Sequence, residues 1–303
     1  MDLVSINDLS RNLIGKIFKA TDEVKKKPYY PLLENKVLAM IFAKPSTRTR
    51  VSFEAGLHQM GGHAIYLGVH DIQLGRGETI ADTAKVLSRY CDMIMARLFE
   101  HKDIVELAKH STVPVINGLT DLLHPCQALS DMYTIDEKLE RLKGVRLAYL
   151  GDGNNNVTHS LLHACSKLGM HITVACPKNF EPDKTIVANA KKNAKITGSE
   201  ITITTDPKKA AKGAEVLYTD TWVSMGKESQ QKARDRILKP YQVNEKMVGL
   251  AESYCIVMHC LPAHRGHEIT DKVMDGPHSV VFDQAENRMH VEKAIMGMLL
   301  KKN

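Results

Sequence analysis

Short apolar runs alternate along the chain with longer stretches in which apolar residues recur at helical spacing. The runs have the length of buried strands, and the stretches between them have the length of helices. Alternation of strands and helices is typical of an α/β fold with largely parallel sheets. The predicted strands are residues 37–42, 64–67, 93–96 and 115–117 in the first half and 146–150, 171–175, 200–204, 216–219, 255–259 and 280–283 in the second.

The helical patterns indicate two domains. They lie at residues 79–89, 103–110, 159–168, 182–193, 207–211 and 244–249. A helix at 124–140 is predicted to join the halves, and an amphipathic helix at 286–303 to pack back on the first. We therefore expect two doubly wound parallel-sheet domains, 1–135 and 136–285. Loops at the carboxyl ends of parallel strands converge, so the active site is expected in the cleft between these domains.

The first candidate for chemistry is the segment 46–50, which reads Ser-Thr-Arg-Thr-Arg. It lies where the strand pattern of 37–42 ends and a helical pattern begins. Helix N-termini present unpaired N–H groups, hydroxyls add donors, and arginine supplies a bidentate fork. The segment therefore favours a phosphate or another oxyanion, with a Ser/Thr N-cap followed by solvated arginines as the alternative.

Polar residues also follow the other predicted strands of the first half. Arg97 comes directly after 93–96. His124 and Gln127 are three residues apart at the start of a helix, so both can donate to one carbonyl oxygen that gains negative charge. The alternatives are a surface charge at Arg97 and a capping His with a solvated Gln. The polar segment 71–79 is either a mobile lid or a plain loop.

In the second half, residues 151–156 read Gly-Asp-Gly-Asn-Asn-Asn after a strand. This resembles half of a dinucleotide fingerprint, but the third glycine is missing and no acid ends the next strand, so a polar ligand is favoured over nicotinamide. Residues 220–226 read Asp-Thr-Trp-Val-Ser-Met-Gly. Their carboxylate could hold an ammonium group and their turn a carboxylate, while an N-cap Asp before a loop is the alternative.

The last two candidates are Cys260 and Arg288. Cys260 lies at a strand-to-loop edge next to polar groups, which favours a ligand-contacting thiol over a core residue. A nucleophile pair of Cys260 with His259 or His264 is the alternative. Arg288 lies at the start of the last helix, where a surface charge is the alternative to a binding role.

Composition narrows the classes of function. The 303 residues carry a formal net charge of +6, but the lysines and arginines are dispersed and no aromatic residues interleave with them, which disfavours nucleic acid. A basic excess favours small anionic substrates. The six cysteines show neither metal-ligand spacing nor a disulfide framework. No apolar stretch has membrane-spanning length and no secretory signal is present, so we expect a cytoplasmic protein that binds no membrane.

Taken in order, these segments resemble the aspartate/ornithine transcarbamoylase family over nearly the whole chain, from residue 42 to residue 288. Segment 46–50 and the His-Pro-Cys-Gln of 124–127 resemble the carbamoyl-phosphate half that the family shares. Segments 220–226 and 259–262, the latter reading His-Cys-Leu-Pro, resemble the ornithine branch. The aspartate branch would be expected to carry Pro at position 260 and to lack Ser-Met-Gly.

The resemblance assigns a role to each candidate residue. The implied carbamoyl-phosphate ligands are Ser46, Thr47, Arg48, Thr49, Gln73, Arg97, His124, Gln127, Cys260, Leu261 and Arg288, with Gln73 reaching the site possibly across a subunit boundary. The implied ornithine ligands are Asn156, Asp220, Ser224 and Met225, with Asn155 as an alternative to Asn156. The implied catalytic groups are Cys260, Arg97, His124 and Arg288.

The implied reaction is transfer of the carbamoyl group of carbamoyl phosphate to the δ-amine of L-ornithine, which gives citrulline and phosphate in arginine metabolism. It requires no metal or organic cofactor, and the family resemblance implies a homotrimer or a multiple of one. The direction of flux stays open. The alternatives are carbamoyl transfer to putrescine or to an acylated ornithine, and a non-catalytic binding protein on the same fold.

Overall fold

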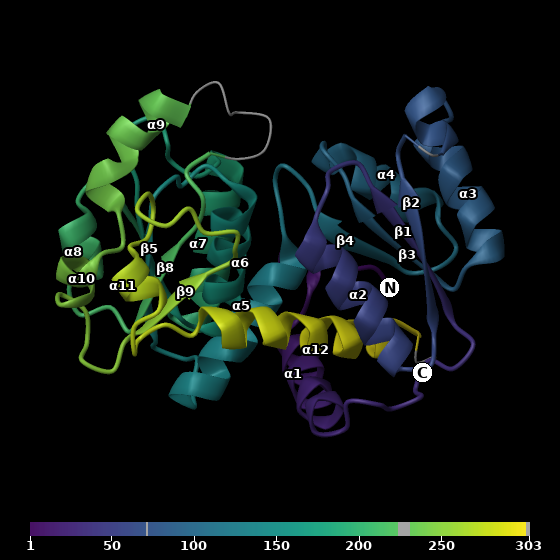
Figure 1. Cartoon of the computed structure of the whole chain (residues 1–303), viewed down its shortest axis with the longest axis horizontal. Helices are drawn as coiled ribbons and strands as arrows, with labels where there is room; N and C mark the ends of the chain where they lie inside the picture. The colour runs from purple at the N-terminus through teal and green to yellow at the C-terminus, as the bar shows by residue number, and fades with distance from the viewer. Residues whose placement is uncertain (71, 224–230, 301–303) are drawn as a thin grey trace. The chain divides into compact units, whose positions relative to one another are not determined.

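The computed structural model describes residues 1–70, 72–223 and 231–300. The chain divides into two compact units. Unit 1 consists of Met1–Ser130 and Asn287–Asn303, and unit 2 of Asp131–Glu286. Each unit contains its own sheet with every strand pair parallel (Figure 1). The prediction of two parallel-sheet α/β domains is confirmed.

Unit 1 is built on a four-stranded sheet with strand order β2-β1-β3-β4. Its strands are β1 (Val37–Phe42), β2 (His63–Gly68), β3 (Met93–Arg97) and β4 (Val115–Leu119). Its helices are η1 (Ile6–Asp8), α1 (Arg11–Lys26), α2 (Thr47–Gln59), η2 (Gln73–Arg76), α3 (Ile80–Tyr90), α4 (His101–His110), the first part of α5 (Pro125–Leu139) and α12 (Val281–Leu300) from Asn287 onward. The central strands β1 and β3 are almost wholly buried, as expected for a sheet with both faces covered.

Unit 2 is built on a five-stranded sheet with strand order β7-β6-β5-β8-β9. Its strands are β5 (Arg146–Leu150), β6 (His171–Ala175), β7 (Ile201–Thr204), β8 (Val216–Thr219) and β9 (Ile256–His259). Its helices are the rest of α5 from Asp131, α6 (Asn156–Leu168), α7 (Lys184–Thr197), α8 (Pro207–Ala211), α9 (Gln231–Leu238), η4 (Lys239–Tyr241), α10 (Glu245–Val248), α11 (Asp271–Met274) and the start of α12 (Val281–Leu300). The strand order reverses beside β5, so the loops after β5 and β8 leave neighbouring strands at one edge of the sheet.

One predicted strand is wrong. Residues 280–283 do not pair in a sheet, because helix α12 begins at Val281 and continues to Leu300. Val281 and Gln284 are buried whereas Phe282 between them is 64% exposed, which is helical rather than alternating burial. The short apolar run Val280-Val281-Phe282 is the first turn of that helix.

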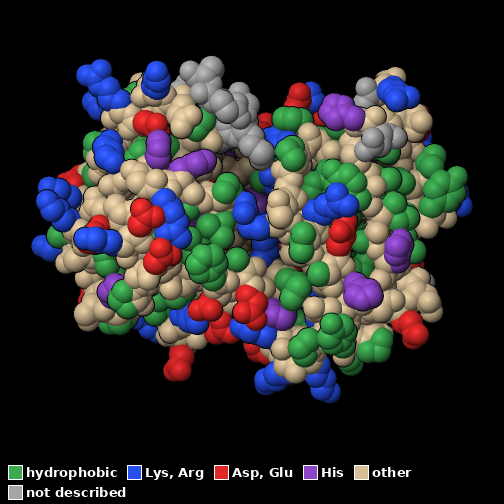
Figure 2. All heavy atoms as spheres, viewed as in Figure 1, with side chains coloured by type: hydrophobic (Ala, Val, Ile, Leu, Met, Phe, Trp, Pro, Cys, Tyr) green, Lys and Arg blue, Asp and Glu red, His purple; other side chains and the backbone are tan. Residues whose placement is uncertain are grey.

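The surface agrees with the dispersed charge of the sequence. On the face that Figure 2 shows, Lys and Arg side chains are spread out and interleaved with Asp and Glu. Across the three described ranges of the chain, none of the helices has both the length and the apolar character needed to span a membrane.

Candidate active site

In unit 1 the predicted phosphate ligands follow the carboxyl ends of parallel strands. Segment 46–50 follows β1, Arg97 is the last residue of β3, and His124 follows β4 and directly precedes helix α5. The strands are parallel neighbours, so their carboxyl ends lie at one edge of the sheet. Polar groups therefore gather where the sheet ends and two helices begin.

Ser46 is the N-cap of helix α2 and has an extended backbone, as N-cap residues typically do. Its Oγ accepts a hydrogen bond from the backbone N–H of Thr49 at 3.2 Å and donates to Thr49 Oγ1 at 3.0 Å. Ser46 is therefore an N-cap, which is the alternative that the sequence left open for this segment. Capping and anion binding are compatible, because the first turn of the helix keeps further N–H groups for a ligand.

Arg288 on α12 joins the two sequence segments of this site. Its Nη2 donates to Thr49 Oγ1 at 2.6 Å, and its Nη1 donates to Gln127 Oε1 at 3.2 Å. Arginine has no acceptor, so Gln127 must turn its carbonyl oxygen to Arg288 and present its NH₂ group on the other side. Thr49 Oγ1 accepts from both Ser46 and Arg288, so its own proton is directed to a different acceptor. The carbonyl oxygen of Gln127 and the hydroxyl oxygen of Thr49 are thus both bound to Arg288.

Arg97 and His124 are buried polar side chains, exposed by only 6% and 5%. Burial lowers the pKa of His124 well below its usual value, and the positive charges of Arg288 and Arg97 lower it further. The imidazole is therefore neutral at physiological pH. A neutral imidazole can donate a hydrogen bond to a developing oxyanion without adding a third positive charge.

The remaining predicted phosphate ligands of unit 1 are more accessible. Thr47 is exposed and Arg48 is half-buried in the first turn of α2. Gln73 is exposed in the 3₁₀ turn η2. Arg50 is directed elsewhere, because its Nε donates to Glu54 at 3.0 Å and its guanidinium lies 4.0 Å from the ring centre of Tyr66.

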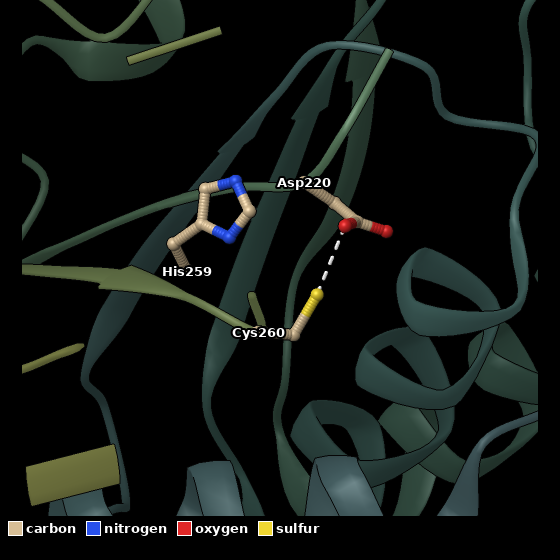
Figure 3. Close-up of side chains that lie close together, drawn as sticks. All are labelled: Asp220, His259 and Cys260. Carbon is tan, nitrogen blue, oxygen red and sulfur yellow. Dashed lines mark hydrogen bonds between the residues drawn. The ribbon is translucent and has the colours of Figure 1, made fainter. Parts of the chain in front are cut away.

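In unit 2 the end of β8 and the end of β9 bring Asp220 and Cys260 together. The Cys260 thiol donates to Asp220 Oδ1 at 2.9 Å (Figure 3). Burial raises the pKa of Asp220, while His259 and the bond from Cys260 oppose that rise. A buried carboxylate at a strand end can orient an ammonium or amine group of a ligand.

His259 completes the cluster in Figure 3 but is not positioned as a base for the thiol. Its Nδ1 accepts from the backbone N–H of Leu261 at 2.8 Å, so the proton of the neutral ring is on Nε2, 3.1 Å from Glu268 Oε1. The other candidate, His264, contacts Thr221 Oγ1 at 3.0 Å. The geometry favours a ligand-contacting thiol over a Cys–His nucleophile pair.

Among the described residues, this cluster is also the one group that could hold a metal ion. The potential ligand atoms of Asp220, His259 and Cys260 lie within 4.8 Å of one another. Its atoms are already committed to hydrogen bonds. The lone pair of His259 Nδ1 faces the N–H of Leu261, and the thiol proton faces Asp220. A cation would have to replace both bonds, so the donor set fits a hydrogen-bonded cluster better than a metal centre.

The hydrogen bonds show how Asn155 is held in the fold. Asn155 is the N-cap of α6, and its Oδ1 accepts from Thr158 N at 2.8 Å. Its amide donates to Tyr149 Oη and to the carbonyl of Asp152, each at 2.7 Å. Asn155 is thus used by the fold, while Asn156 is half-buried at the first helical position. The assignment of ornithine to Asn156 stays a prediction.

Two predicted ornithine ligands, Ser224 and Met225, lie outside the described residues. Leu261 lies inside them, half-buried next to Cys260, with a positive φ of 58°. Sequence reasoning missed two buried acids at the site: Glu268, which faces His259, and Glu292, which pairs with Arg288 at 2.9 Å. Their burial is a tertiary property, although the spacing of four residues between Arg288 and Glu292 on a helix is a local signal for the second.

Comparison with known proteins covers both units. Residues 1–137 match the carbamoyl-phosphate binding domain of aspartate/ornithine carbamoyltransferases, and residues 143–299 match the Asp/Orn binding domain. The chain is 52% identical to the ornithine carbamoyltransferase of Thermococcus kodakarensis over 99% of the chain and 96% of that protein. It is 51% identical to the enzyme of that name from Bacillus subtilis, over 99% of the chain and 94% of that protein.

Solved structures agree. The structure of ornithine carbamoyltransferase from Pyrococcus furiosus superposes with a TM-score of 0.94 at 52% identity, covering 97% of the chain and 95% of that structure. The enzyme of that name from Gloeobacter violaceus superposes with a TM-score of 0.90 at 44% identity, covering 99% of the chain and 98% of that structure.

Proposed function

The chain belongs to the aspartate/ornithine carbamoyltransferase family, and from that premise we propose that it catalyses carbamoyl transfer from carbamoyl phosphate to the δ-amine of L-ornithine. The products are citrulline and phosphate, and the reaction belongs to arginine metabolism. The two relatives compared above match the chain over 96% and 94% of their own length, and both are named ornithine carbamoyltransferase.

One observation carries the assignment of the carbamoyl-phosphate site. Arg288 donates simultaneously to Thr49 and to Gln127, which are distant from each other in the sequence. The hydroxyl-rich start of α2 and the donor-rich start of α5 therefore contact one guanidinium. This arrangement supports a ligand with a phosphate at the start of α2 and a carbonyl oxygen, which gains negative charge during the reaction, near His124 and Gln127.

We assign Ser46, Thr47, Arg48, Thr49 and Arg97 to the phosphate. His124, Gln127 and Arg288 are assigned to the carbonyl oxygen of the carbamoyl group, with Cys260 and Leu261 beside it. Asn156 and Asp220, together with Ser224 and Met225, hold ornithine. The buried Asp220 supports this last role, because a carboxylate shielded from water interacts more strongly with an amine than an exposed one does.

In the reaction the neutral δ-amine of ornithine attacks the carbamoyl carbon. A C–N bond forms, the bond between that carbon and the bridging oxygen of the phosphate breaks, and the amine proton moves to a phosphate oxygen. Negative charge grows on the carbonyl oxygen and on the leaving phosphate. Donors fixed in advance at both places lower the barrier, because they need not reorganise as the charge develops. We propose that these side chains suffice without a metal or an organic cofactor.

The further assignments are also proposals. The carbamoyl-phosphate domain comprises residues 1–135 with the returning segment 286–303, and the ornithine domain comprises 136–285. The active form is a homotrimer or a multiple of one, in which the exposed Gln73 completes the phosphate site of a neighbouring subunit. The enzyme acts in the cytoplasm. The two family models, which match residues 1–137 and 143–299, support the division into these two domains.

An acceptor assay tests the proposed function. The purified protein is given carbamoyl phosphate with ornithine, putrescine or acetylornithine in parallel, and the carbamoylated product is measured. We expect citrulline from ornithine at a kcat/KM far above the other two. A preference for putrescine or acetylornithine would show that ornithine is not the acceptor. Absence of product from all three would favour a binding protein on this fold.

A further inference from the structure

Glu292 on helix α12 is a buried acid beside the carbamoyl-phosphate site. It is fully buried, with an exposed fraction of 0%, and so is exposed less than the Arg288 that it contacts. Burial raises the pKa of Glu292, and the Arg288 guanidinium opposes that rise. Fully burying a carboxylate costs free energy unless its contacts repay the lost hydration. Arg288 Nε donates to Glu292 Oε1 at 2.9 Å, and the Ser52 side chain also interacts with this carboxyl group.

The geometry of a guanidinium gives that bond a specific effect. The group is planar and rigid, with its five N–H donors in fixed directions. Fixing the Nε–H direction therefore fixes the directions of both terminal nitrogens. In this chain those terminal nitrogens donate to Thr49 and Gln127, which belong to α2 and α5. Glu292 thus holds the one edge of Arg288 that does not face the ligand-binding groups.

Attraction of substrate cannot explain a carboxylate at this place. Carbamoyl phosphate is a dianion, so the negative charge of Glu292 opposes its binding. A role in orienting Arg288 can outweigh this unfavourable charge. A donor misplaced by about 1 Å can slow a reaction on the order of a hundredfold.

We propose that Glu292 is a positioning residue for carbamoyl transfer, which acts by holding Arg288 Nε so that the terminal nitrogens of Arg288 meet the carbonyl oxygen of the carbamoyl group. This inference rests on the proposed function. It concerns only the carbamoyl donor, so it holds for whichever amine accepts the group.

The chain offers a matched control for this pair. Arg50 and Glu54 on α2 have the same spacing of four residues and the same atoms in contact, Nε to Oε1 at 3.0 Å. Their side chains are 48% and 35% exposed, whereas those of Arg288 and Glu292 are 5% and 0% exposed. A substitution at Glu54 removes a bond of the same geometry without changing the contacts of Arg288, Thr49 or Gln127.

The experiment compares Glu292→Leu, Glu292→Gln and Glu54→Leu with the parent by kcat, by KM for carbamoyl phosphate and by thermal unfolding. Glu292→Leu removes the acceptor, and we expect kcat to fall by roughly 10- to 100-fold, with a smaller change in KM. Glu292→Gln keeps an acceptor at Oε1 and should restore most of kcat. Glu54→Leu should keep the kcat of the parent.

A double-mutant cycle separates positioning from general stability. If Glu292 acts through Arg288, then Glu292→Leu should cause no further loss of kcat in an Arg288→Ala background. Equal factors in both backgrounds would overturn the proposal, as would a folded Glu292→Leu variant with the kcat of the parent. If Glu292→Leu does not fold, a Glu292→Gln variant with a kcat more than tenfold below the parent would overturn it, and one close to the parent would support it.

Failure of the proposed function gives a different result. Then the parent itself forms no citrulline. Crystal structures of the parent and of Glu292→Leu still test the inference, because they require no turnover. The proposal expects Arg288 to leave Thr49 or Gln127 in the variant, and unchanged contacts of both would overturn it.

Discussion

Burial decides what His124 can contribute. Its imidazole is exposed by only 5%, and two arginines carry positive charge beside it. Both effects favour the neutral ring, which can donate one hydrogen bond to the carbonyl oxygen of carbamoyl phosphate. The sequence predicted the donor but not its charge, because the charge depends on burial and on Arg97 and Arg288, which are distant in the chain.

The neutral state of His124 makes stability dependent on pH. The folded-state pKa lies below the ordinary value of 6.5, so the unfolded chain binds more protons between these two values. The stabilising effect is therefore complete above about pH 6.5 and is lost as the pH falls toward the folded-state pKa. We expect the difference in unfolding free energy between the parent and His124→Gln to decrease over that interval, as measured by denaturant unfolding at several pH values. A difference that is constant from neutral pH to pH 5 would contradict it.

In the asparagine run 154–156, the residue type alone does not show which side chain the fold uses. Asn154, Asn155 and Asn156 are chemically identical, and the sequence left Asn155 and Asn156 as alternatives. The structure shows that the side chain of Asn155 is occupied by Thr158, Tyr149 and the carbonyl of Asp152. N-cap preference for Asn was a usable local signal, but only once the helix start was placed to within one residue.

At the scale of elements, the alternating pattern located most strands because the central strands of a parallel sheet are buried on both faces. The predicted bounds of 37–42, 146–150, 171–175 and 216–219 equal those of β1, β5, β6 and β8. The error at 280–283 has a physical cause. A run of a few apolar residues fits a strand and one turn of a buried helix equally well, and here the turn continues as α12.

The start of α2 serves both the fold and the site, which leads to a prediction for Ser46→Ala. Loss of the cap should lower the unfolding free energy by about 1 kcal/mol. It should also weaken carbamoyl-phosphate binding, because Ser46 contributes a hydroxyl and positions Thr49. Both quantities can be measured, by denaturant unfolding and by titration calorimetry.

Ser10→Ala is the control. Ser10 caps α1 through the same bond, from Leu13 N to Ser10 Oγ at 3.1 Å, but lies outside the site. We expect a similar loss of stability with unchanged affinity for carbamoyl phosphate. If both variants lost affinity equally, the effect of Ser46 would be general destabilisation and not contact with the ligand.

At the scale of the whole molecule, the hydrogen-bond donors proposed for the phosphate and the carbonyl oxygen of carbamoyl phosphate are distant in sequence but lie in one unit. Segment 46–50, Arg97, His124 and Gln127 belong to unit 1, and Arg288 returns to that unit through the last part of α12. Asp220 and Cys260 belong to unit 2. The sequence could order these motifs but could not show that Arg288 contacts Thr49, since that contact depends on the packing of α12.

This division predicts where each substrate protects the backbone from hydrogen exchange. Carbamoyl phosphate alone should slow exchange in unit 1, most strongly at 46–50 and 124–128, because bound ligand stabilises the state that binds it. Mass spectrometry of exchanged peptides measures this directly. Protection around Asp220 without protection at 46–50 would contradict the assignment of carbamoyl phosphate to unit 1.

The most direct test of the account is the Michaelis constant for carbamoyl phosphate in Arg48→Ala, with Arg50→Ala as the control. Loss of Arg48 leaves a desolvated dianion without its partner, which costs roughly 2–5 kcal/mol. The constant should therefore rise by roughly 30-fold or more. Arg50 pairs with Glu54 and contacts Tyr66, so its removal should change the constant little. An unchanged Michaelis constant in Arg48→Ala would contradict the assignment of the start of α2 to the phosphate of carbamoyl phosphate.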